Sequence, residues 1–197
     1  MFFVRERGNV IDYEIPIKGD LKNPKFILKD AIFDALGNIF IKPPTTPYRM
    51  EVRNVETEIE SQEYFAHNFE LNKQKAKFRM AKITPTKTGQ FVTIWKRNEN
   101  KITEPYNIDD EFEFYIIATR QEEKFGVFIF DKTILSENKI LTTKSGQGKR
   151  GIRVYPTWSV TESKQAQKTQ NWQTKYFVEI RTETDINKAR KLLKELT

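Results

Sequence analysis

Apolar and polar residues alternate along several stretches of the chain, which is the pattern of strands that bury one face. The clearest case is residues 75–83, where Lys75, Lys77 and Arg79 are separated by apolar residues. Successive side chains of a strand point to opposite faces, so we predict cations on one face of a sheet and core residues on the other. The same reasoning predicts further strands at residues 10–17, 51–60, 64–71, 90–97, 111–119, 124–130 and 152–155.

Helices are predicted where apolar residues recur every three or four positions between suitable boundary residues. Proline opens the earliest of these segments and glycine closes it, while side-chain caps are available for the later ones. The predicted helices are residues 24–37, residues 131–138 with Asp131 as the cap, residues 163–180 with Thr161 or Ser163 as the cap, and residues 185–196.

This order of elements predicts an α+β fold, with a mostly antiparallel, curved or barrel-like sheet flanked by an early helix and two C-terminal helices. Aromatic residues make up 13% of the chain and most are phenylalanine, which favours a well-packed core. The length of 197 residues suits one domain. We therefore expect an N-terminal arm over residues 1–22 and a single α+β domain over residues 23–197.

Two residue types that carry much of enzyme chemistry are almost missing, since the chain has no cysteine and one histidine, His67. Disulfides, thiolate nucleophiles and cysteine-ligated zinc are excluded, together with most histidine-based metal sites and serine–histidine triads. His67 lies between Phe65 and Phe69 in an alternating stretch, so we interpret it as a satisfied core histidine. No signal peptide or membrane-spanning segment is evident. We expect a cytoplasmic protein with no membrane contact, no cofactor and no metal site.

Basic residues are concentrated in two segments of this chain, whose overall net charge is +7. Residues 73–98 carry a net charge of +8 with no acidic residue, and residues 139–181 carry +7. Residues 99–138 between them carry −6, and residues 1–72 carry −3. Either acidic strands neutralise the basic ones, or the two basic segments meet on one face and bind an anion. We favour the second interpretation, because both basic segments also contain polar and aromatic residues suited to recognition.

The first basic segment contains the turn and strand AKITPTKTGQFVTIWKR, residues 81–97. Its hydroxyls, amides and cations suit phosphate and sugar contacts, and its indole offers a stacking face. An ordinary polar turn with the tryptophan in the core would give the same pattern. The candidate contact residues are Lys82, Thr84, Thr86, Lys87, Gln90, Trp95, Lys96 and Arg97.

The second basic segment contains KSGQGKRGIRVYPTW, residues 144–158, whose glycines let a ligand approach the backbone closely. Lys149, Arg150 and Arg153 would neutralise phosphates, and Tyr155 and Trp158 would stack on bases. A flexible surface loop with aromatic residues packed beneath it is the alternative.

The predicted helix that follows carries cations on the face opposite its apolar stripe. Lys164 and Lys168 share that face and would lie along phosphates, although a solvated helix face has the same appearance. Gln165 and Gln170, together with Gln90, are candidates to read base edges or sugars. Nucleic acid is therefore the partner that we favour.

Two other classes of function remain open. One is a metal-dependent nuclease that uses Glu60, Glu63 or Glu70, although the basic strand at residues 75–83 contains no acidic residue. The other is an interaction or inhibitor module for an acidic protein partner. The sequence does not indicate an oligomeric state.

Three separated blocks, AKITPTKTGQFVTIWKR, GKRGIRVYPTW and KQAQKTQNWQ, together resemble the MepB family over roughly residues 30–180. Residues 1–24 and the helix after residue 183 fall outside that core. The resemblance implies a cytosolic protein from a bacterium, a phage or a mobile element. It also implies a shape similar to nucleic-acid-binding or endonuclease-related folds, which supports an anionic partner and keeps the nuclease hypothesis open.

Overall fold

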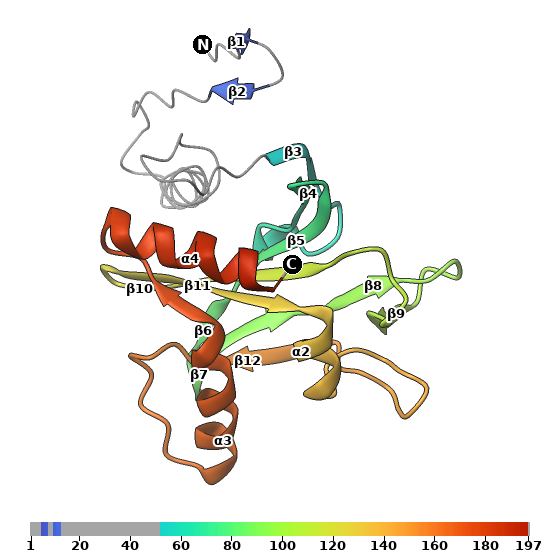
Figure 1. Cartoon of the computed structure of the whole chain (residues 1–197). Coiled ribbons are helices and arrows are strands. Elements are labelled where there is room, and N and C mark those ends of the chain that lie inside the picture. The colour runs from blue at the N-terminus through green and yellow to red at the C-terminus, as the bar shows by residue number, and fades with distance from the viewer. Residues whose placement is uncertain (1–4, 8–9, 13–51, 197) are drawn as a thin grey trace.

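The computed structural model describes residues 5–7, 10–12 and 52–196 (Figure 1). The strands are β1 (Arg5–Arg7), β2 (Val10–Asp12), β3 (Val52–Thr57), β4 (His67–Leu71), β5 (Gln74–Met80), β6 (Lys82–Thr84), β7 (Lys87–Thr93), β8 (Trp95–Arg97), β9 (Thr103–Pro105), β10 (Phe114–Gln121), β11 (Lys124–Asp131), β12 (Gly151–Val154) and β13 (Phe177–Glu179). The helices are η2 (Gln62–Tyr64), α2 (Lys132–Glu137), α3 (Lys164–Gln173), η3 (Thr174–Tyr176) and α4 (Glu183–Glu195). The predicted early helix, and the predicted strand at residues 10–17 beyond Asp12, lie outside the described residues.

The largest sheet has six strands in the order β13-β11-β10-β5-β4-β3. Its neighbouring strands are antiparallel except β5 and β10, which run parallel with Phe78 opposite Ile116. Smaller sheets have the orders β12-β7-β6, β8-β9 and β1-β2. The mixed α+β class is confirmed. The barrel-like closure is wrong, because β13 and β3 end the main sheet without pairing to each other.

The central strand β5 is covered on both faces, and the main sheet separates two hydrophobic clusters. On one side Phe78 packs with Leu193 of α4. On the other side, Tyr115 of β10 packs with Val92 and Ile152, which belong to the three-stranded sheet β12-β7-β6. Figure 1 shows α4 and this smaller sheet on opposite sides of β10 and β11. The fold is therefore layered as helix, main sheet and smaller sheet.

The double burial of β5 corrects the prediction that its cations would line a solvent-facing surface. Lys75, at the start of the strand, is exposed, but Lys77 is half-buried and Arg79 is completely buried. The alternation itself is present, since Phe78 and Met80 face α4. The smaller sheet covers the opposite face, so Lys77 and Arg79 point into the protein.

The predicted long helix at residues 163–180 is shorter than expected. Ser163 caps it as predicted, because its hydroxyl accepts a hydrogen bond from the Ala166 amide at 3.1 Å. α3 ends at Gln173, and after η3 the chain joins the main sheet as β13. The ring of Phe177 lies 4.5 Å from that of Phe128, between centroids, so burial of this aromatic side chain in the sheet core favours a strand over a further helical turn.

The other helix boundaries agree well with the sequence. Asp131 caps α2 by accepting a hydrogen bond from the Ile134 amide at 2.7 Å, as predicted. α4 begins with a capping box in which Thr182 and Asp185 bond each other's backbone amides. The two C-terminal helices are thus confirmed. Within the described residues, none of the helices has the length and apolar composition that crossing a membrane requires.

Candidate functional site

The outer face of the smaller sheet carries an aromatic residue between two cations. Phe91 on β7 lies directly opposite Lys82 on β6 and directly opposite Arg153 on β12. Residues paired across antiparallel strands point to the same face, so these three side chains form one row across the sheet. Val92 and Ile152, one position along, point inward and are buried. We call Lys82, Phe91 and Arg153 the outer row.

Further aromatic rings surround the outer row. The ring of Tyr64 meets that of Phe91 edge-on, with 6.3 Å between centroids, and the Lys82 ammonium lies 4.5 Å from the Tyr64 centroid. The Phe91 ring lies against Gly151, where an added Cβ on residue 151 would be 2.5 Å from the Phe91 Cζ. Tyr155 lies against Gly89 in the same way, where a Cβ would be 2.6 Å from the ring. Glycine at both positions therefore lets the rings lie close to the backbone.

Arg153 fixes the β6–β7 hairpin to β12, which joins the two basic segments of the sequence. Its Nη1 donates to the carbonyl oxygens of Lys87 at 3.2 Å and Gly89 at 3.1 Å. Its Nη2 donates to the Thr84 hydroxyl at 2.6 Å. All of these acceptors are neutral, so no carboxylate offsets the positive charge of the guanidinium. Arg153 therefore both orders the hairpin and contributes a positive charge to the outer face.

The first basic segment, residues 73–98, is largely neutralised, contrary to prediction. Six of its eight basic residues lie within ion-pair distance of a carboxylate. The pairs are Lys75–Glu111, Lys77–Glu58, Arg79–Glu58, Lys82–Glu63, Lys96 with Glu104 and Asp110, and Arg97–Glu60. The Lys82–Glu63 pair is the loosest at 4.0 Å and is exposed to solvent. The idea of one continuous unpaired patch is therefore wrong for this segment.

The second basic segment, residues 139–181, keeps its charge. Among its nine basic residues, all of which the structure describes, one has a carboxylate partner within the described part of the chain, in the pair Arg181–Glu179. Lys149, Lys164 and Lys168 are exposed and form no ion pair with any described carboxylate. Lys87, on the neighbouring hairpin, is exposed and equally unpaired among these residues. Positive charge is therefore available around β12, α3 and the tip of the β6–β7 hairpin.

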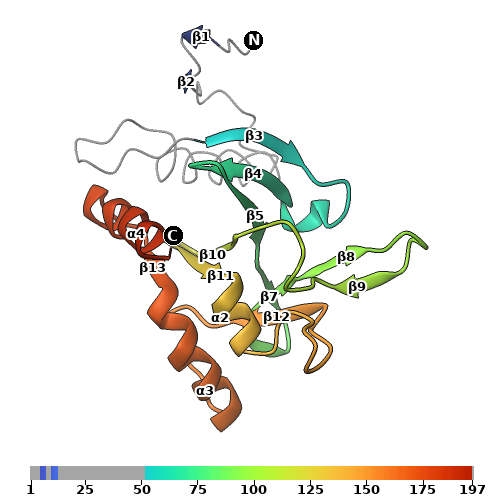
Figure 2. The same ribbon diagram turned by 45° about the vertical axis from the view of Figure 1, so that its right-hand side comes forward.

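The C-terminal end of α3 meets the free edge of β12, where the Gln173 side chain takes the place of a neighbouring strand. The Gln173 amide accepts a hydrogen bond from the Tyr155 amide nitrogen at 2.9 Å and donates to the Arg153 carbonyl at 2.9 Å. These two bonds satisfy the backbone of an edge strand and block further strand pairing there. Figure 2 shows α3 extending away from the sheets at this edge. Lys164 and Lys168 on α3 are thus tied to the same structural unit as Arg153.

Several residues predicted to contact nucleic acid have other structural roles. Gln90 is buried, and its side chain donates to the Arg120 carbonyl at 3.1 Å. Gln170 donates to the carbonyls of Pro156 and Ser159, holding the loop before α3. Trp158 meets the ring of Phe177 edge-on, with 5.3 Å between centroids. These three side chains face the protein, so the prediction that they read or stack on bases is not supported by their positions.

The remaining predicted residues divide by location. Trp95 is half-buried, with the Arg97 guanidinium 5.4 Å from its ring centroid, and it lies on the separate β8–β9 hairpin. Arg150 is exposed and donates to the Thr103 carbonyl at 2.9 Å. Thr86 and Gln165 are exposed. Sequence reasoning missed Phe91 and Tyr64, because their importance depends on strand pairing that brings distant segments together.

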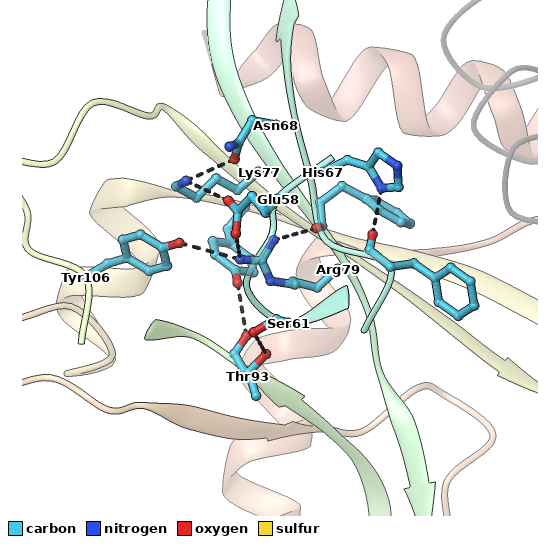
Figure 3. A network of polar contacts seen from close by, with 11 residues as sticks. Glu58, Ser61, His67, Asn68, Lys77, Arg79, Thr93 and Tyr106 are labelled. Atoms are coloured by element: carbon cyan, nitrogen blue, oxygen red, sulfur yellow. Dashed lines mark hydrogen bonds and ion pairs between the residues drawn. The ribbon is translucent and has the colours of Figure 1, made fainter. Parts of the chain in front are cut away.

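A second site lies between the two sheets, where the buried cations of β5 meet one carboxylate (Figure 3). The Lys77 ammonium donates to Glu58 Oε1 at 3.0 Å and to Asn68 Oδ1 at 3.0 Å. Arg79 donates through Nη2 to Glu58 Oε2 and, at 3.5 Å, to the Tyr106 hydroxyl. We call Glu58, Lys77 and Arg79 the ionic cluster. Its side chains are 12%, 15% and 0% exposed, respectively.

Burial shifts the pKa of Lys77 in the ionic cluster and of two tyrosines beside it. Desolvation lowers the pKa of the Lys77 ammonium, and the neighbouring Glu58 carboxylate only partly offsets that effect. Desolvation also raises the pKa of the Tyr106 and Tyr115 phenols, so both hydroxyls stay protonated near neutral pH. The Tyr115 hydroxyl donates to the Thr93 carbonyl at 3.0 Å. The two phenols are therefore neutral hydrogen-bonding groups beside a charged pair.

The glutamates considered for nuclease chemistry do not converge. Glu60 pairs with Arg97 and Glu63 approaches Lys82, whereas Glu70 lies on β4 opposite Lys75. No group of three acidic or histidine side chains within the described part of the chain is arranged to hold a metal ion. His67 is half-buried, and its ring nitrogens contact the Phe65 carbonyl at 2.8 Å and the Thr57 hydroxyl at 3.2 Å, so both are satisfied.

Comparison with known proteins gives one consistent result. The family model described as MepB-like matches residues 58–179, which include both sites. The chain is also similar to a solved structure named "Crystal Structure of MepB", with 34% sequence identity and a TM-score of 0.65. That match covers 81% of this chain and 99% of the other. No protein with a curated description matches.

Proposed function

The chain belongs to the MepB-like family, and the matched region contains the whole smaller sheet. We propose that the outer face of this sheet binds nucleic acid. The binding face is the outer row together with Tyr155, the hairpin tip at Lys87 and the exposed face of α3. A cytoplasmic location, as expected from the sequence, would give the protein access to such a partner.

The observation that carries the proposal is the outer row itself. Phe91 stands in register between Lys82 and Arg153, with Tyr155 nearby on the same face. Single strands are bound without strict sequence preference when aromatic rings stack on bases and neighbouring cations contact the phosphates. A sheet face that alternates these two groups at strand spacing provides both contacts at once. We therefore favour single-stranded over double-stranded nucleic acid.

Charge supports the same surface. The segment over residues 139–181 has a net charge of +7 and is adjacent to the hairpin through the pairing of β12 with β7. Lys149 and Lys168 form no ion pair with any carboxylate of the described residues, so both are available to a phosphate. Contacts from such cations release counterions, so binding would weaken steeply with added salt. An acidic protein would be attracted to the same cations but would not use the aromatic rings for base stacking.

Replacing Lys87, Lys149 and Lys168 together with alanine is expected to weaken binding and flatten its salt dependence. Every phosphate of a single strand that is no longer bound by a cation should reduce the slope of log affinity against log salt by about 0.7, so the slope of the triple variant should fall by roughly two units. Fluorescence anisotropy with labelled single- and double-stranded DNA and RNA, from about 50 to 200 mM salt, measures both effects.

The matched control removes three exposed lysines that lie outside the proposed binding face, Lys73, Lys101 and Lys124, none of which forms an ion pair with a described carboxylate. This variant has the same net charge as the first, so any difference between the two depends on location. The proposal is contradicted if both variants lose affinity equally, or if the first keeps the parent slope. Failure of all four nucleic acids to bind the parent at moderate salt would favour an acidic protein partner instead.

A further inference from the structure

The ionic cluster holds two cations against one carboxylate. Lys77 and Arg79 project from the same face of β5, and Glu58 bridges them. The nearby Asp110 carboxylate is already engaged, because it pairs with Lys96 and accepts a hydrogen bond from the backbone amide of Asn107 at 2.8 Å. We propose that Lys77 and Arg79 form a binding site for a phosphate group, whose position the Glu58 carboxylate occupies when no ligand is bound. This site does not depend on the nucleic-acid interface.

The hydrogen bonds of Arg79 point to a missing acceptor. Its side chain is completely buried, and its Nε has no hydrogen-bond partner among the described residues. Nη1 donates to the Phe78 carbonyl at 3.0 Å, and Nη2 donates to Glu58. Buried donors are nearly always satisfied in folded proteins, so an unpartnered guanidinium nitrogen requires an explanation. Guanidinium forks present parallel N–H groups that match phosphate and carboxylate oxygens.

Lys77 places a second charge beside that fork. Two of its three N–H groups donate to Glu58 and Asn68, and the ammonium lies 4.8 Å from the centroid of the Tyr106 ring. Arginine supplies a directional fork and lysine a compact charge, and phosphate sites in proteins commonly combine the two. The Tyr106 hydroxyl, 3.5 Å from Arg79 Nη2, adds a neutral group that can donate to an anion.

Glu58 is placed so that it can leave without disturbing the sheet. It lies just after β3, on a segment whose backbone turns through Ser61 and Phe65, both in the left-handed region with φ of 58° and 50°. The adjacent residue Ile59 is 87% exposed, so its side chain does not anchor this segment to the core. Lys77 and Glu58 both reach the surface, whereas Arg79 lies beneath them. Figure 3 shows the Glu58 carboxylate in contact with both Lys77 and Arg79. In this proposal the Glu58 side chain rotates away and a phosphate takes its place, while β5 stays fixed.

The test removes the internal carboxylate and asks whether phosphate replaces it. In Glu58→Gln, inorganic phosphate is expected to bind about tenfold more tightly than in the parent, because it no longer competes with a charged side chain. Binding is measured by titration calorimetry and by the rise in Tm relative to chloride at matched ionic strength. Glu58→Gln combined with Arg79→Lys, which keeps the charge but removes the fork, should lose most of that gain.

Glu111→Gln is the control, because it removes the carboxylate of an exposed ion pair with Lys75. If phosphate stabilises this control as much as Glu58→Gln, or stabilises Glu58→Gln no more than chloride does, the site does not exist. Should Glu58→Gln fail to fold, Glu58→Asp is titrated instead. It keeps the charge, but its shorter side chain reaches the cations less well, so phosphate should bind it more tightly than the parent, and equal binding would contradict the site. Oligonucleotides with and without a 5′-phosphate then show whether the phosphate comes from a nucleic-acid end or a small molecule.

Discussion

Replacing Glu58 with alanine is expected to lower the free energy of unfolding by about 3–5 kcal/mol, which would be among the largest effects of any single change in this chain. The carboxylate is the shared partner of Lys77 and Arg79, and Arg79 is completely buried. Without Glu58, both cations remain in a poorly solvated environment with no opposite charge in contact. Chemical denaturation followed by circular dichroism measures the change.

A double variant separates the cost of buried charge from the cost of a smaller side chain. Glu58→Ala combined with Lys77→Met should be more stable than Glu58→Ala alone, since one uncompensated cation is removed and its hydrocarbon length is kept. Glu111→Ala, which breaks the exposed pair with Lys75, should change stability little. If Glu58→Ala behaves like Glu111→Ala, the ionic cluster does not contribute to stability as its burial implies.

Replacing Phe91 with leucine is expected to weaken binding of single-stranded nucleic acid by about 1–3 kcal/mol, or roughly five- to 150-fold. Leucine retains an apolar side chain over Gly151 but provides no ring for a base. The salt slope should stay near the parent value, because no cation is removed. Anisotropy titrations of the parent and variant at one salt concentration, repeated at a second, measure both quantities.

Phe125→Leu is the matched control for this change. Phe125 is also half-buried, but it packs against the cluster on the α4 side of the main sheet. Equal losses of affinity in the two variants would mean that the effect comes from lowered stability rather than from stacking. Unchanged affinity in Phe91→Leu would remove the aromatic part of the proposed interface.

Local signals in the sequence predicted local structure well. Asp131 is followed by a short helix and caps it, and the apolar runs on either side of residues 122–123 form the β10–β11 hairpin. These features depend on side chains only a few positions apart. The alternation in β5 was also predicted correctly, because period two is a property of any strand.

Non-local pairing decided the features that the sequence did not predict. Alternation placed Lys77 and Arg79 on one face, but it could not indicate that a second sheet covers that face. Their partner, Glu58, comes from a segment 19 and 21 positions earlier. The outer row likewise exists only because β12 pairs with β7. The length of α3 was overestimated because apolar residues such as Tyr176 and Ile180 continue its helical spacing, although Tyr176 lies in η3 and Ile180 directly follows β13.

The charge pattern identified the two basic segments of the sequence. The pairing of β7 with β12 brings part of each segment together. Which segment would be neutralised was not evident, because the carboxylates concerned lie in residues 58–63 and 104–111, on both sides of the first basic segment. The sequence gives the number of charged residues, but tertiary contacts decide which of them remain free to bind an anion.

Ultraviolet cross-linking of the protein to a single-stranded oligonucleotide, followed by mass spectrometry of the peptides, tests the proposed interface most directly. Zero-length cross-links form where a base lies against a side chain, so we expect the modified peptides to contain Phe91 or Tyr155 and to disappear at high salt. Cross-links confined to α4 or to the β10–β11 turn, or none at salt concentrations where the parent binds, would contradict the assignment of this face.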